Sequence, residues 1–130
     1  MSRVPASLAA RVRTRAAHRC EYCRLPRAAT QAPFEVEHII PLKHEGPTTL
    51  ENLAFACFHC NRHKGVNLCG LHPRTGKLIR LFDPRRDEWT RHFRLTDGRL
   101  AGKTDIGKAT VQVLHMNKLE QVQLRRLWLA

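Results

Sequence analysis

Acidic residues, aromatic residues and long apolar runs are all scarce in this chain of 130 residues. No stretch approaches the roughly 18 consecutive apolar residues that a membrane-spanning helix needs. The first twenty residues carry five arginines and lack the apolar core of a signal peptide. Apolar residues at 42% and charged residues at 26% are ordinary for globular proteins, which excludes a fully disordered chain. We therefore expect a soluble, cytoplasmic protein without a membrane partner, folded as a single domain over residues 1–130.

The shortage of acidic residues leaves the chain strongly basic. Lys and Arg number 23 against 11 Asp and Glu, which gives a net charge of +12 and an isoelectric point near 10.6. The excess is spread along the chain, with 10 basic and 5 acidic groups in residues 1–65 and 13 and 6 in residues 66–130. Solubility alone requires a net charge of about 2 to 8 of either sign. The charge therefore predicts a polyanionic partner, with nucleic acid as the first candidate.

The five cysteines have the spacing of a metal site. An odd number without an export signal argues against a disulfide framework. Two Cys-x-x-Cys pairs, Cys20 with Cys23 and Cys57 with Cys60, allow four thiolates to reach one tetrahedral ion. We predict one structural zinc ion, closed to substrate, whose binding contributes to folding. Two unrelated redox or buried pairs are the alternative, and Cys69, outside the pattern, is predicted to be a buried thiol.

Hydrophobic periodicity and turn signals predict an α+β chain in three stretches: an N-terminal helix in 1–19, the zinc knuckle and core in 20–66, and supporting elements in 67–130. In the core, a strand over 34–40, a loop over 41–51 and a strand over 52–55 precede a helix that begins near Asn61. The supporting elements are strands over 78–82 and 89–95, a turn at Asp97-Gly98, a helix over 105–115, and a second helix capped by Asn117 with Glu120.

The residues between and after the cysteine pairs form a recognisable order. Glu37-His38-Ile39-Ile40-Pro41-Leu42 is followed by a glycine-containing loop, by Asn52-Leu53 and, after Cys60, by Asn61-Arg62-His63-Lys64-Gly65. In this order and spacing, residues 15–66 resemble the HNH endonuclease family, whose core is the ββα-metal fold, here with a four-cysteine zinc knuckle. Glu37 stands where aspartate or histidine is most often found. The resemblance implies a metal-dependent DNA endonuclease that leaves 3′-hydroxyl and 5′-phosphate ends.

The resemblance also implies a role for each residue of the motif. His38 would be the general base, because an imidazole with a pKa of about 6.5 removes protons well at neutral pH. Glu37 and Asn61 would hold a catalytic divalent ion through oxygen atoms, which favours Mg²⁺ or Mn²⁺, with Ni²⁺ or Zn²⁺ as alternatives. Asn52 would hydrogen-bond the loop backbone and thereby fix His38.

Other interpretations of these residues remain open at the level of sequence. A non-catalytic zinc-knuckle protein that only binds nucleic acid would share the charge and the cysteines, but it would not need a base beside two hard-metal ligands. His38 taken alone would by default be interpreted as a partly buried strand histidine. His59 and His63 are spaced as a second metal pair, and His63 and Lys64 are predicted to be phosphate contacts or solvated groups. The oligomeric state and the form of the DNA substrate are not indicated.

Overall fold

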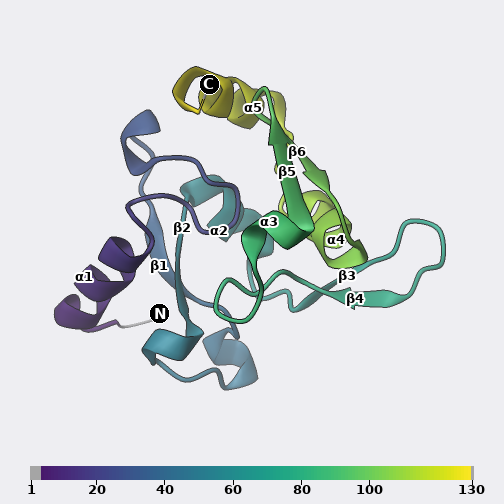
Figure 1. Ribbon diagram of the computed structural model, residues 1–130. Coiled ribbons are helices and arrows are strands. Elements are labelled where there is room, and N and C mark those ends of the chain that lie inside the picture. The colour runs from purple at the N-terminus through teal and green to yellow at the C-terminus, as the bar shows by residue number, and fades with distance from the viewer. Residues whose placement is uncertain (1–3, 130) are drawn as a thin grey trace.

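The computed structural model describes residues 4–129 as a mixture of helices and three antiparallel two-stranded sheets (Figure 1). The predicted α+β class is confirmed. In chain order the elements are α1 (Ala6–Arg15), η1 (Arg27–Ala29), β1 (Glu35–His38), η2 (Leu42–His44), η3 (Leu50–Asn52), β2 (Leu53–Ala56), α2 (Phe58–Lys64), β3 (Cys69–Leu71), β4 (Leu78–Arg80), α3 (Trp89–His92), β5 (Phe93–Thr96), β6 (Arg99–Gly102), α4 (Asp105–Val113) and α5 (Leu119–Trp128).

The first half of the chain is built on the β1–β2 hairpin. Its register places Glu35 opposite Ala56 and His38 opposite Leu53. Every residue of β2 is buried, because α1 covers one side through Val12 while the cysteine knuckle covers the other. α1 and α2 lie on opposite sides of this hairpin (Figure 1). The hairpin therefore holds the end of β1 in a fixed place between two helices.

The second half packs two hairpins against α4. The β3–β4 and β5–β6 sheets both contact this helix. Gly70 of β3 approaches α4 so closely that a Cβ there would lie 2.8 Å from Val113 Cγ2. The β5–β6 hairpin turns at Asp97 and Gly98, where φ is 50° and 81°, as the sequence predicts.

A common apolar core joins the cysteine knuckle to the C-terminal elements. Its residues come from the knuckle turn, the residue after β1, β2, the first turn of α2, the segment after β4, β5, β6 and the loop after α4. They are Cys20, Tyr22, Cys23, Leu25, Ile39, Ala54, Ala56, Cys57, Cys60, Leu81, Phe82, Phe93, Leu100, Leu114 and Met116. Every helix in residues 4–129 is too short or too polar to cross a membrane. The C-terminal elements thus share one apolar core with the knuckle.

The strand expected over 89–95 is wrong in its first half, where residues 89–92 form the short helix α3 and the strand begins at Phe93. The Trp89 indole N–H donates to the Tyr22 carbonyl at 2.8 Å, and the Trp89 ring packs on Phe93. A partner 67 residues away therefore decides the local conformation. The alternation of apolar and polar residues over 89–95 cannot indicate such a long-range contact.

Two further expectations about side chains are wrong. Asn117 does not cap α5, because its amide bonds the Leu100 backbone, accepting from N–H at 2.8 Å and donating to C=O at 2.7 Å. The helix begins after Lys118 without a side-chain cap. Cys69 is exposed rather than buried, because its neighbour Gly70 is the residue that faces α4.

Candidate active site

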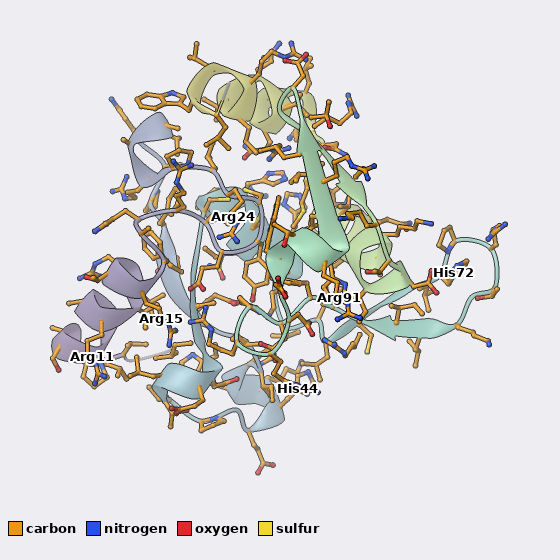
Figure 2. The ribbon with its side chains drawn as sticks, in the orientation of Figure 1. Arg11, Arg15, Arg24, His44, His72 and Arg91 are labelled. Atoms are coloured by element: carbon orange, nitrogen blue, oxygen red, sulfur yellow. The ribbon has the colours of Figure 1, made fainter. Side chains whose placement is uncertain are left out.

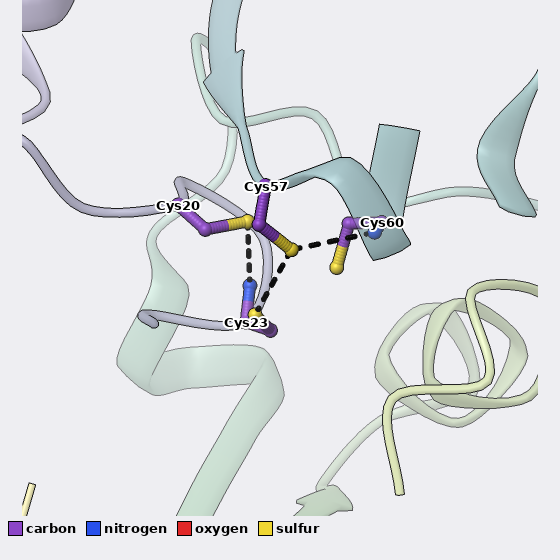
Figure 3. A group of neighbouring side chains, drawn as sticks. All are labelled: Cys20, Cys23, Cys57 and Cys60. Carbon is purple, nitrogen blue, oxygen red and sulfur yellow. Dashed lines mark hydrogen bonds between the residues drawn. The ribbon is translucent and has the colours of Figure 1, made fainter. Parts of the chain in front are cut away.

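The four predicted zinc ligands come together at one point (Figure 3). Cys20 and Cys23 lie on the turn after α1, Cys57 follows β2, and Cys60 lies in the first turn of α2. All four residues are buried, and their sulfur atoms lie within 4.8 Å of one another. Zinc–sulfur bonds of about 2.3 Å place tetrahedral sulfurs about 3.8 Å apart. The Cys23 and Cys57 sulfurs are 3.8 Å apart, so the cluster has the geometry of the predicted structural zinc site.

Both cysteine turns stabilise thiolate charge in the same way. The Cys23 N–H donates to Cys20 Sγ at 3.4 Å, and the Cys60 N–H donates to Cys57 Sγ at 3.3 Å. Hydrogen bonds with the other three thiols hold the pKa of Cys23 well below its ordinary value. Contacts with Cys20 and Cys23 raise the pKa of both Cys57 and Cys60, because charge on one sulfur opposes charge on the next. A bound cation removes that opposition, so this cluster favours metal over four free thiols.

A groove of about 300 Å³ lies beside the knuckle, between β1, the loop after it and the end of α2. Three predicted residues line it, with Glu37 and His38 at the end of β1 and Asn61 on α2. Asn61 directly follows Cys60, so the cysteine cluster sets the place of Asn61 as well as the start of α2. The other lining residues are Glu35, Val36, Pro41, Leu42, Lys43, Gly65 and Val66.

The His38 ring is held within this groove by Thr48. His38 Nε2 and Thr48 Oγ1 are 2.8 Å apart, and Thr48 belongs to the loop between η2 and η3. Desolvation lowers the pKa of His38, and the nearby positive charge of Lys64 lowers it further. The imidazole is therefore neutral at pH 7, which is the protonation state a general base requires.

Asn52 closes the loop that follows His38. Its Oδ1 accepts the Ile40 N–H at 2.9 Å, while its Nδ2 donates to Ile40 O at 3.0 Å and to Pro47 O at 2.9 Å. Gly46 makes the closure feasible, because a Cβ at that position would lie 1.7 Å from Ile40 O. These bonds join the two ends of the loop and have the geometry expected of a backbone clamp.

Glu37 is buried in a small network that the sequence did not predict. Its Oε2 accepts a hydrogen bond from the Tyr22 hydroxyl at 2.7 Å, and its Oε1 lies 3.4 Å from Lys64 Nζ. Burial raises the pKa of Glu37, and the Lys64 charge and the Tyr22 hydrogen bond oppose that rise. Tyr22 lies between Cys20 and Cys23, so its hydrogen bond connects the zinc knuckle directly to Glu37 of β1.

The prediction that Lys64 contacts phosphate or solvent is wrong. The residue is only 2% exposed, and its ammonium donates to Ile39 O at 2.9 Å besides facing Glu37. Its aliphatic stem therefore lies inside the protein, while the charge compensates a buried carboxylate and holds the end of β1. The sequence places Lys64 on a predicted helix, but it gives no sign of the acidic partner on another element.

His59 and His63 stack on one another rather than converging on a metal. Their ring centroids are 4.2 Å apart, and His63 also stacks on His115 at 4.8 Å. His59 Nε2 hydrogen-bonds His115 O, and His63 Nδ1 hydrogen-bonds His59 O. Within residues 4–129, only the four cysteines bring three or more His, Cys, Asp or Glu ligand atoms together. The alternative metal pair receives no support from this arrangement.

The remaining donors in the groove suit a hard divalent cation. Glu37 offers a carboxylate, and the Asn61 amide forms no hydrogen bond with any other residue in 4–129. The 3.4 Å separation between Glu37 Oε1 and Lys64 Nζ is longer than an optimal hydrogen bond, so this oxygen is only loosely held. Carboxylate and amide oxygens are ligands for Mg²⁺ or Mn²⁺. The residues present therefore fit such an ion.

The family model of the HNH endonucleases matches residues 20–67. This segment is an HNH domain. The HNH domain contains both cysteine pairs, the β1–β2 hairpin and α2, in agreement with the resemblance seen in the sequence.

Comparison with curated proteins gives a relative whose similarity extends beyond the HNH domain. The chain is 30% identical to the Septu protein PtuB of Bacillus thuringiensis over 113 residues. The alignment covers 85% of this chain and 41% of PtuB, so the chain spans about two fifths of the length of that relative. No solved structure matches the chain significantly.

Proposed function

We propose that the chain is a metal-dependent DNA endonuclease that hydrolyses a phosphodiester bond in the groove at His38. The observation that carries the proposal is the convergence of a neutral imidazole, a carboxylate and a free amide on one groove beside the cysteine cluster. The HNH match supports phosphodiester chemistry, and the charge of +12 supports a nucleic-acid substrate. We treat residues 1–130 as one nuclease unit, because a common core joins the knuckle to the C-terminal elements.

His38 supplies the base in this scheme. Hydrolysis requires the attacking water to lose a proton while charge on the phosphate and on the leaving oxygen is stabilised. With Thr48 Oγ1 accepting from Nε2–H, the lone pair of His38 lies on Nδ1, where it can accept the water proton. Asn52 keeps the loop that carries Thr48 in register with the strand that carries His38.

Glu37 and Asn61 would hold the divalent ion, with Mg²⁺ or Mn²⁺ preferred. When bound, the ion supplies charge neutralisation at the scissile phosphate and at the leaving oxygen. Tyr22 orients the Glu37 carboxylate through its hydrogen bond, and the cysteine-anchored start of α2 orients Asn61. Lys64, being buried, stabilises the Glu37 carboxylate, so exposed Lys43 on the groove edge is the better candidate for a phosphate contact.

Cleavage of supercoiled plasmid with Mg²⁺, Mn²⁺, Ni²⁺ or Zn²⁺ tests the proposal. We expect His38→Ala to lower the rate by about 10² to 10⁴ while zinc content, folding and DNA binding persist. Asn61→Ala removes one oxygen ligand, so a higher metal concentration should partly restore cleavage, whereas it cannot replace the base lost in His38→Ala. His18→Ala, an exposed histidine outside the groove, is the matched control and should cut normally.

Two results would contradict the endonuclease assignment. One is a His38→Ala protein that cuts plasmid at the wild-type rate. The other is a wild-type protein that cuts under none of the four metals. The second result, with DNA binding intact, would leave a zinc-knuckle nucleic-acid-binding protein as the function.

A further inference from the structure

The β3–β4 hairpin lies outside the proposed catalytic groove and projects from the body of the molecule (Figure 1). One face of the hairpin packs against α4 through Gly70. The opposite face carries the cross-strand pair Leu71 and Leu78, which are 57% and 75% exposed. Two leucines side by side on the open face of a two-stranded ribbon provide apolar surface that a partner can bury.

The charge around this leucine pair has one sign. Residues 66–82 contain no acidic residue. Arg74 and Lys77 at the tip are exposed and form no ion pair within residues 4–129, whereas Arg80 is paired with Asp87. Asp105 lies beside the tip, with its Oδ1 3.6 Å from His72 Nε2. The free cations beside the leucines are therefore complementary to a polyanion.

The tip is ordered by its own hydrogen bonds. His72 Nδ1 accepts the N–H groups of Arg74 at 3.2 Å and Thr75 at 3.3 Å. The His72 N–H donates to Lys77 O, and the Gly76 N–H donates to His72 O, each at 2.9 Å. Gly76 has φ of +72°, a conformation that suits glycine. Figure 2 shows His72 on this arm, well separated from His44 near the groove. A tip held in this way loses little conformational entropy when it binds.

We propose that the β3–β4 ribbon docks in the major groove of duplex DNA. The inference rests on the proposed function and names its substrate as B-form duplex. Strands about 4.8 Å apart with their side chains fill a groove about 12 Å wide but not the minor groove of about 6 Å. The major groove of an RNA duplex is too narrow and deep to admit them.

Docking in this orientation assigns a contact to each side chain. Leu71 and Leu78 face the base edges, where the thymine C5-methyl group is the apolar feature. Arg74 and Lys77 reach phosphates on the groove walls. Val66 lines the catalytic groove, and at about 3.3 Å per residue Leu71 lies within roughly 17 Å of it. That span is about five base pairs, so one duplex can contact both places.

Binding measurements on the full chain in a His38→Ala background, without added divalent ion, test the ribbon contact. The probes are an A·T-rich DNA duplex of about three turns, the same duplex with uracil replacing thymine, and the matching RNA duplex. The variants are Arg74→Gln/Lys77→Gln and Leu71→Ser/Leu78→Ser. Leu119→Ser/Leu127→Ser on α5, with side chains 64% and 76% exposed, is the matched control.

Each variant has its own expected signature. Loss of the two cations should lower the slope of log affinity against log salt by about 2. Loss of the two leucines should leave that slope unchanged, lower affinity for the thymine duplex about tenfold, and abolish the wild-type preference for thymine over uracil. The α5 control should bind as wild type does, and the RNA duplex should bind more weakly throughout.

The proposed ribbon contact is refuted if both hairpin variants bind DNA as tightly as wild type, or if the α5 control loses as much affinity as they do. It is also refuted if the leucine variant differs from wild type only in its sedimentation, which would indicate that the leucines form a protein–protein surface. The plasmid assay separates this proposal from the endonuclease proposal. If the wild type cuts and both hairpin variants bind and cut equally well, the ribbon contact alone fails. If the wild type never cuts but the hairpin signatures appear, only the endonuclease assignment fails.

Discussion

Replacing Tyr22 with phenylalanine should weaken divalent-ion binding at the proposed Glu37 and Asn61 site while leaving zinc binding by the four cysteines intact. The substitution removes one hydroxyl, which donates to Glu37 Oε2 at 2.7 Å, and keeps the ring that packs edge-on against Phe82. Among the described residues, Cys20 and Cys23 form no hydrogen bond with that hydroxyl. The variant therefore tests whether the knuckle orients the Glu37 carboxylate toward a bound ion, as proposed.

The contacts of Glu37 set the size of the effect. A hydrogen bond to a charged group contributes about 1.5–3 kcal/mol. Loss of a group that orients a metal ligand typically lowers metal affinity about 10- to 100-fold. Burial already raises the pKa of Glu37, and Tyr22 opposes that rise, so Tyr22→Phe raises the pKa further. Because metal binding needs the carboxylate, the deficit should be larger at acidic pH and should shrink as pH increases.

The assay is Mn²⁺ titration followed by electron paramagnetic resonance, with zinc measured on the same samples. Thr110→Val is the matched control, because it deletes another buried hydroxyl, one that donates to Ile106 O and accepts the Phe82 N–H. The control should lose stability but bind Mn²⁺ like wild type. If Tyr22→Phe binds Mn²⁺ as tightly as wild type at pH 6 and at pH 8, the proposed orientation of Glu37 by the knuckle is refuted.

Three further outcomes follow from the contacts described. Cys57→Ser should lower zinc content and thermal stability, whereas Cys69→Ser, at an exposed position outside the cluster, should change neither by elemental analysis and calorimetry. Since the pKa of His38 is lowered, the acidic limb of the cleavage rate should have its midpoint below about pH 6.5, and a midpoint above that would argue against His38 as base. The Asp87 carboxylate accepts hydrogen bonds from Arg80 at 2.7 and 2.8 Å, and these bonds lower the pKa of Asp87 to about 2. Asp87→Asn should therefore lower the free energy of unfolding by about 1–2 kcal/mol at pH 7. Denaturant titrations should show that this difference persists above pH 4 and disappears as pH falls toward about 2.

The cysteine cluster and the order of the HNH motif residues could both be predicted from the sequence. Each Cys-x-x-Cys pair lies within one turn of the chain, so two of the four ligands of a tetrahedral site can be recognised from local spacing. The order of Glu37, His38, Asn52 and Asn61 is also read directly along the chain. The α+β class follows from short segments with helical or strand periodicity, because this periodicity depends only on residues close together in the sequence.

The contact partners of these residues could not be predicted in the same way, because they lie on distant segments that meet in the folded chain. Lys64 reads as a solvated helix residue until β1 brings Glu37 to within 3.4 Å of it. Tyr22 carries no signal for a role until its hydroxyl meets the same carboxylate from the other side. Trp89 leaves the strand pattern because its indole bonds a carbonyl 67 residues away. Contacts of this kind join segments that are distant in the sequence. The spacing of residues within one segment therefore cannot predict which apolar or charged residue of another segment will contact it.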